Sequence, residues 1–284
     1  MRMTTTDFIA KVIVMKPEQK GSLHPITQIV RAIYPVFQEL GFAIADGPEL
    51  EDEFHNFDAL NVPKDHPARD MQDTFWIKSN VDPRSEIQNP KQIQNLNSNS
   101  DNADIKKSER MVLRTHTSSV QIRYMEDNKP PIRIVVPGKV YRNEATDATH
   151  EAQFYQLEAL YVDKNVTLAH LKGVLGALFQ GVFGDDVNIR FRPSFFPFVE
   201  PGVEVDMQWK GRWLEMGGAG LVHPNVFRSV GIDPNEYQGF AFGFGLDRIA
   251  MLKFGIDDVR HLYTGDLRLV NQFRQGDTSS EKRS

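Results

Sequence analysis

Two stretches of the chain repeat apolar residues at the three- and four-residue spacing of an amphipathic helix. The first begins at Pro25, which suits a first helical position, and ends before Gly41. The second follows Thr167, a residue type that caps helices, and ends at Gly184. The apolar stripes are Ile26, Ile29, Val30, Ile33, Phe37 and Leu40 in the first and Leu168, Leu171, Leu175, Leu178, Phe179 and Val182 in the second. We expect one face of each helix to pack on a core, and Pro35 predicts a kink in the first.

Alternating apolar and polar residues predict strands elsewhere in the chain. The expected strands are residues 42–50, 74–77, 139–144, 153–162, a hairpin over 203–216 and residues 239–245. The first of them meets Pro48, which cannot donate a hydrogen bond to a central ladder. Residues 189–201 also favour an extended chain, but their repeated prolines exclude a central strand. The sequence therefore predicts a mixture of helices with mainly antiparallel strands.

Residues 139–144 and 153–162 flank a polar loop that carries His150, and together they predict an antiparallel hairpin. Side chains two positions apart share a face of a strand. One face of the second arm then carries Phe154, Gln156 and Glu158, and the opposite face carries Tyr155, Leu157, Ala159 and Tyr161. In the first arm Val140, Arg142 and Glu144 align.

The polar face of this hairpin combines one aromatic ring, one guanidinium, one amide and two carboxylates. A guanidinium suits a phosphate or carboxylate, and an aromatic face suits a stacked base. These groups favour a ligand-binding surface. From the hairpin alone, a solvated face with an ion pair between Arg142 and a carboxylate is an equally good interpretation.

The strand at 239–245 has one face of rings and one of almost bare backbone. Phe240, Phe242 and Phe244 share the first face, and Gly239, Ala241, Gly243 and Gly245 share the second. Bare backbone lets a ligand approach closely, and Arg248 in the first turn of the next helix would direct a charge toward it. The alternative is that the small residues only admit a packed neighbour. The spacing Gly-x-Gly-x-x-Arg is not the dinucleotide fingerprint, because Arg stands in its last position.

Composition indicates one main globular domain. The 284 residues include 40% hydrophobic and 10% aromatic residues, which is typical of a folded protein. The net charge of -5 gives no overall signal for nucleic acid, so any such contact would be local or come from a partner. The absence of cysteine excludes disulfides and thiolate sites. No apolar run or leader predicts a membrane or secretory segment, so we expect a cytoplasmic protein.

The ends and one internal stretch differ from the rest of the chain. Residues 79–109 are rich in Asn, Ser, Gln, Asp and Lys and hold no aromatic residue, which predicts a disordered insertion. We therefore divide the chain into an N-terminal segment at 1–21, a catalytic domain at 22–273 and a polar tail at 274–284.

Several of these patterns together resemble a known family. Arg142-x-Glu144, with the loop to His150 and Phe154, resembles motif 2 of the class II aminoacyl-tRNA synthetases. The helix from Pro25, the strand after it and Pro48 resemble motif 1, and the segment ending at Arg248 resembles motif 3. More narrowly, Thr149-His150-(x3)-Phe154-x-Gln156-x-Glu158 and the Phe-Pro-Phe segment at 196–198 resemble the alpha subunits of bacterial phenylalanyl-tRNA synthetases. The resemblance runs from about residue 22 to 273.

The resemblance implies an α+β fold, the class II synthetase catalytic fold of an antiparallel sheet flanked by helices. It also implies that phenylalanine reacts with ATP to give phenylalanyl adenylate, from which the phenylalanyl group passes to tRNA(Phe). Arg142 and Arg248 would be catalytic, and the ATP-binding residues would be Arg142, Glu144, His150, Phe154 and Arg248. The ammonium would meet His116, Ser118, Gln121, Gln156 and Glu158, and the ring would meet Trp76, Phe196, Phe198, Val199, Ala241 and Gly243. Glu200 would bind a metal shared with the partner subunit, with Mg²⁺ as cofactor.

Simpler interpretations exist for several of these residues. Ser118 and Gln121 have the spacing of a helix capping box. Trp76 and the rings at 196 and 198 suit an ordinary core, and the carboxylates at 204, 206 and 215, which are further candidates for Mg²⁺, suit an exposed surface.

The family also sets expectations about assembly. Its active enzyme is a heterotetramer of two alpha and two beta subunits, so we expect a beta subunit as partner. Its alpha subunit normally begins with a long helical hairpin that reaches the tRNA, and the residues before Ser22 are too few to form one. We therefore do not locate the tRNA contacts. The rival hypothesis is a synthetase-like paralogue that binds a ligand or partner and no longer aminoacylates; the presence of Arg142, Arg248, Gln156 and Glu158 favours the enzyme.

Overall fold

The computed structural model describes residues 21–70, 73–77 and 110–273. Apart from Gly21, the predicted N-terminal segment lies outside these residues. The predicted insertion at 79–109 and the polar tail at 274–284 also lie outside them. None of the helices within the described ranges is long and apolar enough to cross a membrane.

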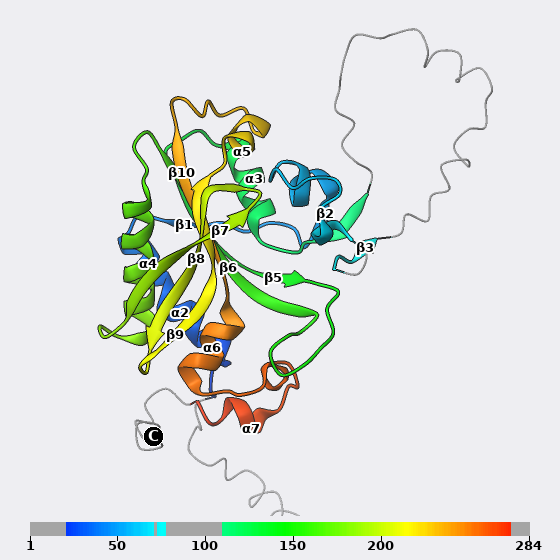
Figure 1. The fold of residues 1–284 in the computed structure, drawn as a ribbon. Helices are drawn as coiled ribbons and strands as arrows, with labels where there is room; N and C mark the ends of the chain where they lie inside the picture. The colour runs from blue at the N-terminus through cyan, green and yellow to red at the C-terminus, as the bar shows by residue number, and fades with distance from the viewer. Residues whose placement is uncertain (1–20, 71–72, 78–109, 274–284) are drawn as a thin grey trace, which may run out of the picture.

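The strands of the described residues form two sheets (Figure 1). The larger has seven strands in the order β1-β5-β6-β10-β9-β8-β7, and the smaller has three in the order β2-β4-β3. Neighbouring strands are antiparallel except for β1, which runs parallel to β5. The strands are β1 (Ala43–Ile44), β2 (Leu50–Asp52), β3 (Trp76–Ile77), β4 (Met111–Leu113), β5 (Ile132–Tyr141), β6 (Gln153–Asp163), β7 (Asn188–Phe196), β8 (Val199–Trp209), β9 (Arg212–Val222) and β10 (Gln238–Gly245). The predicted α+β architecture is confirmed.

Helices cover both faces of the large sheet. Figure 1 shows α2, α4 and α6 together on one side and α3 with the small sheet on the other. The α-helices are α2 (Pro25–Glu39), α3 (Ser118–Asp127), α4 (Leu168–Phe183), α5 (Pro224–Ser229), α6 (Leu246–Phe254) and α7 (Leu267–Val270). Shorter turns are the π-helix η1 (Phe54–Asp58) and the 3₁₀-helices η2 (Pro67–Arg69) and η4 (Val259–Leu262).

The two predicted amphipathic helices form one of two cores. Residues Ile29, Ile33 and Phe37 of α2 pack with Leu175 and Phe179 of α4. The rings of β10 complete this core; Phe240, Phe242 and Phe244 are all buried there. The predicted stripes of both helices and the ring face of the last strand are therefore confirmed.

The second core lies on the opposite face of the sheet. It joins Val120 and Ile122 of α3 and Phe57 of η1 to Ile134 of β5 and Leu160 of β6. Because strand residues alternate between faces, β5 and β6 supply side chains to both sides of the sheet. The cavity described below lies on the side of the second core.

One predicted strand is divided. In place of a strand over residues 42–50, Ala43 and Ile44 pair with β5, and the next paired residues from Leu50 onward belong to the small sheet. Pro48 has no N–H for a ladder. The carbonyls of Gly47 and Pro48 instead accept hydrogen bonds from the buried Arg114 guanidinium, at 3.0 and 3.3 Å. Arg114 thus holds the chain where it passes from one sheet to the other.

The other strand predictions agree with the structure except at residues 199–201. The predicted hairpin at 139–162 is β5 with β6, in which Tyr141 pairs with Gln153. The predicted hairpin at 203–216 is β8 with β9, and it turns at Lys210 and Gly211, both of which have positive φ. Residues 189–196 of the proline-rich segment lie in β7 at the edge of the sheet, where a residue without an N–H is tolerated. Residues 199–201 instead begin β8, which lies between β9 and β7, so the prediction that this segment avoids a central strand is wrong there. The pairing of β8 with β9 is irregular between Val199 and Gly202, where Pro201 lies.

Candidate active site

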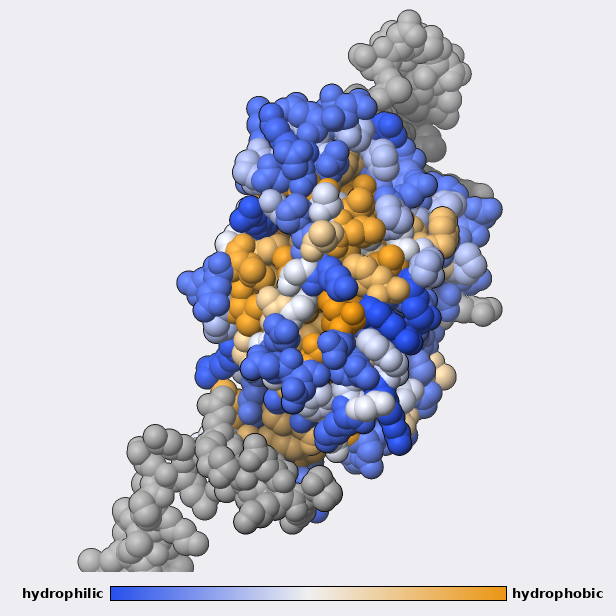
Figure 2. Space-filling model, turned by 60° about the vertical axis from the view of Figure 1, so that its left-hand side comes forward, coloured by the Kyte–Doolittle hydropathy of each residue, from blue (hydrophilic) through white to orange (hydrophobic). Residues whose placement is uncertain are grey.

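A cavity of about 520 Å³ lies between the large sheet and the elements on the side of α3. On the molecular surface, Figure 2 brings the left-hand side of Figure 1 forward and shows apolar side chains gathered in the middle of that face, with polar residues around them. The cavity brings together most of the predicted site residues, which are His116, Ser118, Gln121, Arg142, Glu144, Phe154, Gln156, Glu158, Phe196, Phe198, Val199, Ala241 and Gly243. They come from segments far apart in the chain, so the fold assembles the site.

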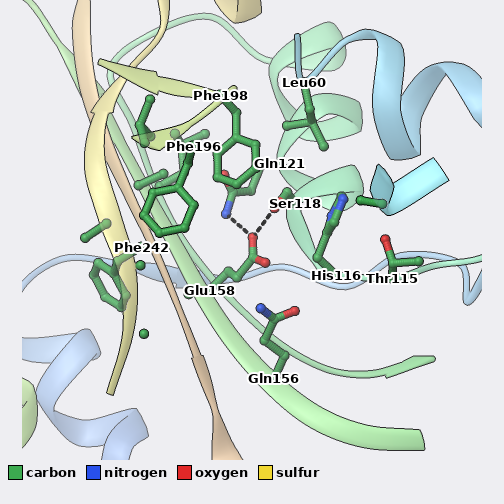
Figure 3. Close-up of a pocket in the computed structure, with 18 of the residues that line it drawn as sticks. Leu60, Thr115, His116, Ser118, Gln121, Gln156, Glu158, Phe196, Phe198 and Phe242 are labelled. Carbon is green, nitrogen blue, oxygen red and sulfur yellow. Dashed lines mark hydrogen bonds between the residues drawn. The ribbon is translucent and has the colours of Figure 1, made fainter. Parts of the chain in front are cut away.

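Glu158 stands at the centre of the polar wall. Its carboxylate Oε2 accepts hydrogen bonds from Ser118 Oγ at 2.5 Å and Gln121 Nε2 at 3.0 Å (Figure 3). The residue is only 5% exposed, and within the described residues no cationic side chain forms an ion pair with it. Glu158 is therefore a buried carboxylate held by neutral side-chain donors.

The environment of Glu158 changes its titration. Burial raises the pKa of Glu158 to about 7, while the Ser118 hydroxyl, the Arg142 charge and the Thr117 backbone amide work against that rise. A cation placed beside this carboxylate would favour its charged form. The carboxylate is therefore suited to receive an ammonium group, which supplies the missing countercharge.

The capping-box interpretation of Ser118 and Gln121 is wrong. Thr117 is the N-cap of α3, and its side chain makes no capping hydrogen bond. Ser118 and Gln121 instead lie one turn apart on the same side of the helix and both donate to Glu158. The first turn of α3 thus serves the cavity.

His116 lies just before α3 and lines the same wall. Burial and the neighbouring Arg142 charge lower its pKa to about 3. Its ring is consequently neutral at pH 7. Its Nδ1 is buried without a hydrogen-bond partner among the described residues, so this atom is free for a polar group in the cavity.

Gln156 lies two residues before Glu158 on β6 and shares its face. Its Oε1 accepts a hydrogen bond from the backbone N–H of Thr117 at 3.3 Å. A Cβ added at Gly243 of β10 would lie 3.1 Å from Glu158 Cγ and 3.2 Å from Gln156 Nε2. The bare face of β10 therefore makes room for the two polar side chains of β6, so the packed-neighbour interpretation holds at Gly243. Gly243 also lines the cavity.

Aromatic rings form the wall opposite Glu158. The centroids of Phe196 and Phe198 lie 6.0 Å apart in a stacked arrangement. Gly218 of β9 lies against this wall, because a Cβ there would approach Phe196 Cζ to 2.8 Å. Figure 3 shows both rings facing the side of the cavity that holds Glu158. The cavity thus pairs an apolar wall with a buried carboxylate.

Arg142 lies just beyond β5, where its N–H still donates to the Ala152 carbonyl at 2.9 Å. Its guanidinium carbon is 5.0 Å from the centre of the Phe154 ring, and its Nη1 is 4.0 Å from Glu144 Oε1. Burial lowers the pKa of Arg142, and the charges of Glu144, Glu158 and Asp73 oppose that shift. This part of the cavity offers a cation and an aromatic face side by side.

Two predicted site residues, Arg248 and His150, lie outside the cavity lining. Arg248, in the first turn of α6, donates from Nε to the Glu215 carbonyl at 2.8 Å, and the nearby Gly245 lines the cavity. His150 lies in the hairpin loop, where Nδ1 is 3.0 Å from Asp147 Oδ2. Both side chains are exposed.

Trp76 and Glu200 also lie outside the cavity lining. The Trp76 ring contacts Phe57, and the Arg110 guanidinium carbon lies 3.8 Å from its centre. The core interpretation of Trp76 therefore fits better than contact with the ring of a ligand. The Glu200 side chain is 72% exposed and its Oε2 is 3.3 Å from His223 Nε2. The structure does not bring Glu200 to the wall that holds Glu158.

The other carboxylates predicted as candidates for Mg²⁺ are engaged in ion pairs. Arg192 contacts Glu204 at 2.7 Å, Asp206 at 2.8 Å and Glu215 at 3.0 Å. Arg190 also contacts Asp206, at 2.9 Å. Two arginines thus pair with three carboxylates and offset most of the negative charge of the cluster. The cluster Glu51, Asp52 and His55 has spacing that suits a metal, but Arg123 occupies the Glu51 carboxylate at 2.5 Å.

The cavity also contains residues that were not predicted. They are mainly apolar and include Leu60, Ile122, Met125, Leu160, Met216, Val222 and Val226. Apart from Leu60, they lie on helices and strands where core packing is the ordinary expectation. A sequence period identifies which of them share a face, but it does not show that the face borders a cavity.

Comparison with known proteins gives consistent results. The family model "tRNA synthetases class II core domain (F)" matches residues 8–273. A phenylalanine–tRNA ligase alpha subunit from Synechocystis sp. is 48% identical over 89% of this chain and 68% of its own length. A protein of the same name from Bacillus cereus is 46% identical over 95% of this chain and 74% of its own.

The crystal structure of pyrrolysyl-tRNA synthetase from Desulfitobacterium hafniense superposes with a TM-score of 0.61 at 16% identity, and the match covers 92% of this chain and 79% of that one. At that identity the likeness concerns the fold alone. The family model and the two sequence relatives carry the assignment, and the chain belongs to the class II tRNA synthetase core domain family.

Proposed function

We propose that this chain is the catalytic alpha subunit of a phenylalanine–tRNA ligase, which activates phenylalanine with ATP and transfers the phenylalanyl group to tRNA(Phe). The relatives at 46–48% identity carry that name. The observation that supports the amino-acid specificity is the pairing of a buried carboxylate, Glu158, with a stacked aromatic wall at Phe196 and Phe198. Phenylalanine carries one ammonium group and one aromatic ring, which are the two kinds of group that these walls suit.

The amino-acid end of the cavity is formed by Glu158, Phe196 and Phe198 with their neighbours. The substrate ammonium would bind Glu158, whose orientation Ser118 and Gln121 already fix. His116 and Gln156 would supply further polar contacts from the same side. Val199, Ala241 and Gly243 would border the ring, because each lines the cavity with a small or apolar surface.

The nucleotide end is formed by Arg142, Glu144 and Phe154, with Arg248 beside it. Arg142 would contact the alpha-phosphate and the substrate carboxylate and stabilise the charge that develops as the carboxylate oxygen displaces pyrophosphate. Phe154 and Arg248 would hold the adenine between them, Glu144 would accept from its amino group, and His150 would contact the outer phosphates. No covalent enzyme intermediate is needed, so catalysis rests on positioning and electrostatics.

Mg²⁺ is the proposed cofactor, with Glu200 as a ligand. Glu200 offers exposed carboxylate oxygens, which is the donor type that Mg²⁺ prefers, and a single carboxylate suits an ion that keeps several waters and takes other ligands from a partner. When bound there, such an ion would supply fixed positive charge. Glu200 would bind it, and His223 would orient the carboxylate through the contact at 3.3 Å.

The proposed partners are a beta subunit, in an assembly of two alpha and two beta chains, and tRNA(Phe). The alpha-subunit name of the relatives supports a second kind of subunit. The overall charge of -5 supports the expectation that much of the tRNA contact comes from elsewhere in the assembly. A cytoplasmic location is part of the same proposal.

The direct test is phenylalanine-dependent exchange between ATP and pyrophosphate, measured with and without a co-expressed beta subunit. We expect exchange in the complex and a fall of about 100-fold in kcat/KM for phenylalanine in Glu158→Gln, because the ammonium loses its buried countercharge. Glu236→Gln, at an exposed carboxylate that pairs with Lys164, is the matched control and should resemble the wild type. A folded complex that binds phenylalanine but supports no exchange would favour the non-aminoacylating paralogue.

A further inference from the structure

The strand β6 extends past the strand that flanks it at the nucleotide end. The last pair between β10 and β6 joins Gly245 to Gln156, because the chain turns into α6 at the next residue. Tyr155 and Phe154 continue β6 beyond this point and are paired only on the β5 side, with Lys139 and Val140. The N–H of Tyr155 that would continue the β10 ladder therefore has no strand partner.

The side chain of Asp247 takes the place of that missing strand. Its Oδ2 accepts the hydrogen bond from the Tyr155 backbone N–H at 2.7 Å. Its Oδ1 accepts a hydrogen bond from the Tyr263 hydroxyl. Asp247 is only 4% exposed, and within the described parts of the chain it forms no ion pair. Burying a carboxylate without a cationic partner costs free energy of folding, and hydrogen bonds to the carboxylate offset that cost.

The segment that carries Tyr263 is attached both to the loop of the β5–β6 hairpin and to the residue that precedes α2. The backbone N–H of Val259 in η4 donates to the Ala148 carbonyl in the hairpin loop at 2.9 Å. The carbonyl of Leu262 lies 2.9 Å from Nε2 of His24, which precedes α2. These two hydrogen bonds fix the backbone beside Tyr263, so the Tyr263 hydroxyl is positioned to orient Asp247.

We propose that Asp247 and Tyr263 are positioning residues that fix the end of β6, and so hold Phe154 in place for adenine. This rests on the proposed function, in which Phe154 stacks on the nucleotide. Tyr155 points away from the cavity while its neighbours Phe154 and Gln156 line it, so the hydrogen bond at Tyr155 fixes the backbone between these two residues. Gln156 keeps its pairing with Gly245, whereas Phe154 does not have such a partner. The loss of Asp247 should therefore affect ATP more than phenylalanine.

The test compares Asp247→Ala, Asp247→Asn and Tyr263→Phe in the complete enzyme complex. Loss of a hydrogen bond to a charged acceptor should raise KM for ATP roughly 10-fold or more in Asp247→Ala, with KM for phenylalanine changed less than about 3-fold. Asp247→Asn retains an oxygen that can accept from Tyr155 and should recover most of the loss. Tyr263→Phe should lie between the wild type and Asp247→Ala.

Two controls match these changes. Asp186→Ala removes an exposed carboxylate that makes no hydrogen bond to another described residue. Tyr237→Phe removes the hydroxyl of a half-buried tyrosine that makes no hydrogen bond to another described residue. Both should leave each KM unchanged.

Hydrogen exchange at the Tyr155 amide provides a readout that does not depend on the reaction. It should be faster in Asp247→Ala than in the wild type and close to the wild type in Asp247→Asn. If the wild-type complex shows no ATP–pyrophosphate exchange, the proposed function fails. Hydrogen exchange at the Tyr155 amide still tests the contact between Asp247 and Tyr155 in that case. Equal rises of both KM values in Asp247→Ala, or unchanged KM for ATP in both Asp247→Ala and Tyr263→Phe, would overturn the proposal.

Discussion

At the amino-acid end of the cavity the central charge, Glu158, is buried and already held by two neutral donors. At the nucleotide end the side chains of Arg248 and His150 are exposed and that of Arg142 is only partly buried. Arg248 contacts a backbone carbonyl of β9, and His150 contacts a carboxylate of its own loop. The amino-acid end is built on strands and the first turn of a helix. The nucleotide end relies on residues at or beyond strand ends, which have fewer fixed neighbours.

This difference indicates that the two ends of the cavity have different roles: the amino-acid end selects the substrate, and the nucleotide end determines the rate of activation. A buried, preset carboxylate selects a ligand by the cost of leaving its charge unpaired, so a compound without an ammonium should bind poorly. Exposed arginines contribute little until a ligand excludes water from them. We therefore expect changes at the amino-acid end to alter which substrate is used, and changes at the nucleotide end to alter the rate of activation.

The largest effect is expected at the nucleotide end. Arg142→Ala and Arg248→Ala each remove one positive charge from the site of phosphate displacement, and exchange should fall by roughly 100-fold or more if these groups stabilise the transition state. Steady-state ATP–pyrophosphate exchange, measured over a range of phenylalanine and ATP concentrations, gives the effect on kcat and on each KM. Near wild-type rates in both variants would contradict the mechanism, and an effect on KM for phenylalanine alone would contradict the different roles of the two ends.

A change of specificity is expected at Ala241. This residue lines the cavity on β10 between Leu160 of β6 and Gly220 of β9. If its methyl group limits the depth of the ring site, Ala241→Gly should favour a phenylalanine that carries a para-halogen. A methyl-sized change in an apolar pocket shifts preference roughly 10- to 200-fold. Exchange measured with both amino acids checks this, and an unchanged ratio would place Ala241 away from the ring.

A smaller effect is expected at Gly218. A Cβ at this position would approach the Phe196 ring to 2.8 Å, so Gly218→Ala must displace that ring. Overpacking of this kind costs about 1 to 3 kcal/mol, and part of that cost should appear as a rise in KM for phenylalanine of roughly 10-fold. KM for ATP should stay near the wild-type value. Gly173→Ala, where a Cβ meets no atom within 4 Å, is the matched control.

The sequence could predict the features that depend on the alternation of side chains along a single strand or on the repeat of apolar residues along a single helix. The alternation along β6 places Gln156 and Glu158 on one face, and the alternation along β10 separates its rings from Ala241 and Gly243. Both follow from strand geometry alone. The family resemblance then suggested which of these faces binds substrate.

The features that were missed depend on contacts between distant segments. The spacing of Ser118 and Gln121 matched a capping box, and only the fold shows that both side chains donate to Glu158 instead. Likewise Asp247 meets Tyr155 because β10 ends where α6 begins, which no local pattern around Asp247 indicates. Trp76 was predicted to border the substrate ring, but it packs against the second core and lies outside the cavity lining.

The pH dependence of phenylalanine activation tests the role of Glu158 most directly. Burial raises the pKa of Glu158 to about 7 in the protein without substrate. The carboxylate is charged above that pH and neutral below it, so kcat/KM for phenylalanine at saturating ATP should fall roughly 10-fold per pH unit as the pH drops below about 7. Glu158→Gln should lose this acid limb. A wild-type profile that stays flat from about pH 5.5 to 8, or an acid limb that persists unchanged in Glu158→Gln, would contradict the assignment of Glu158 as the ammonium-binding group.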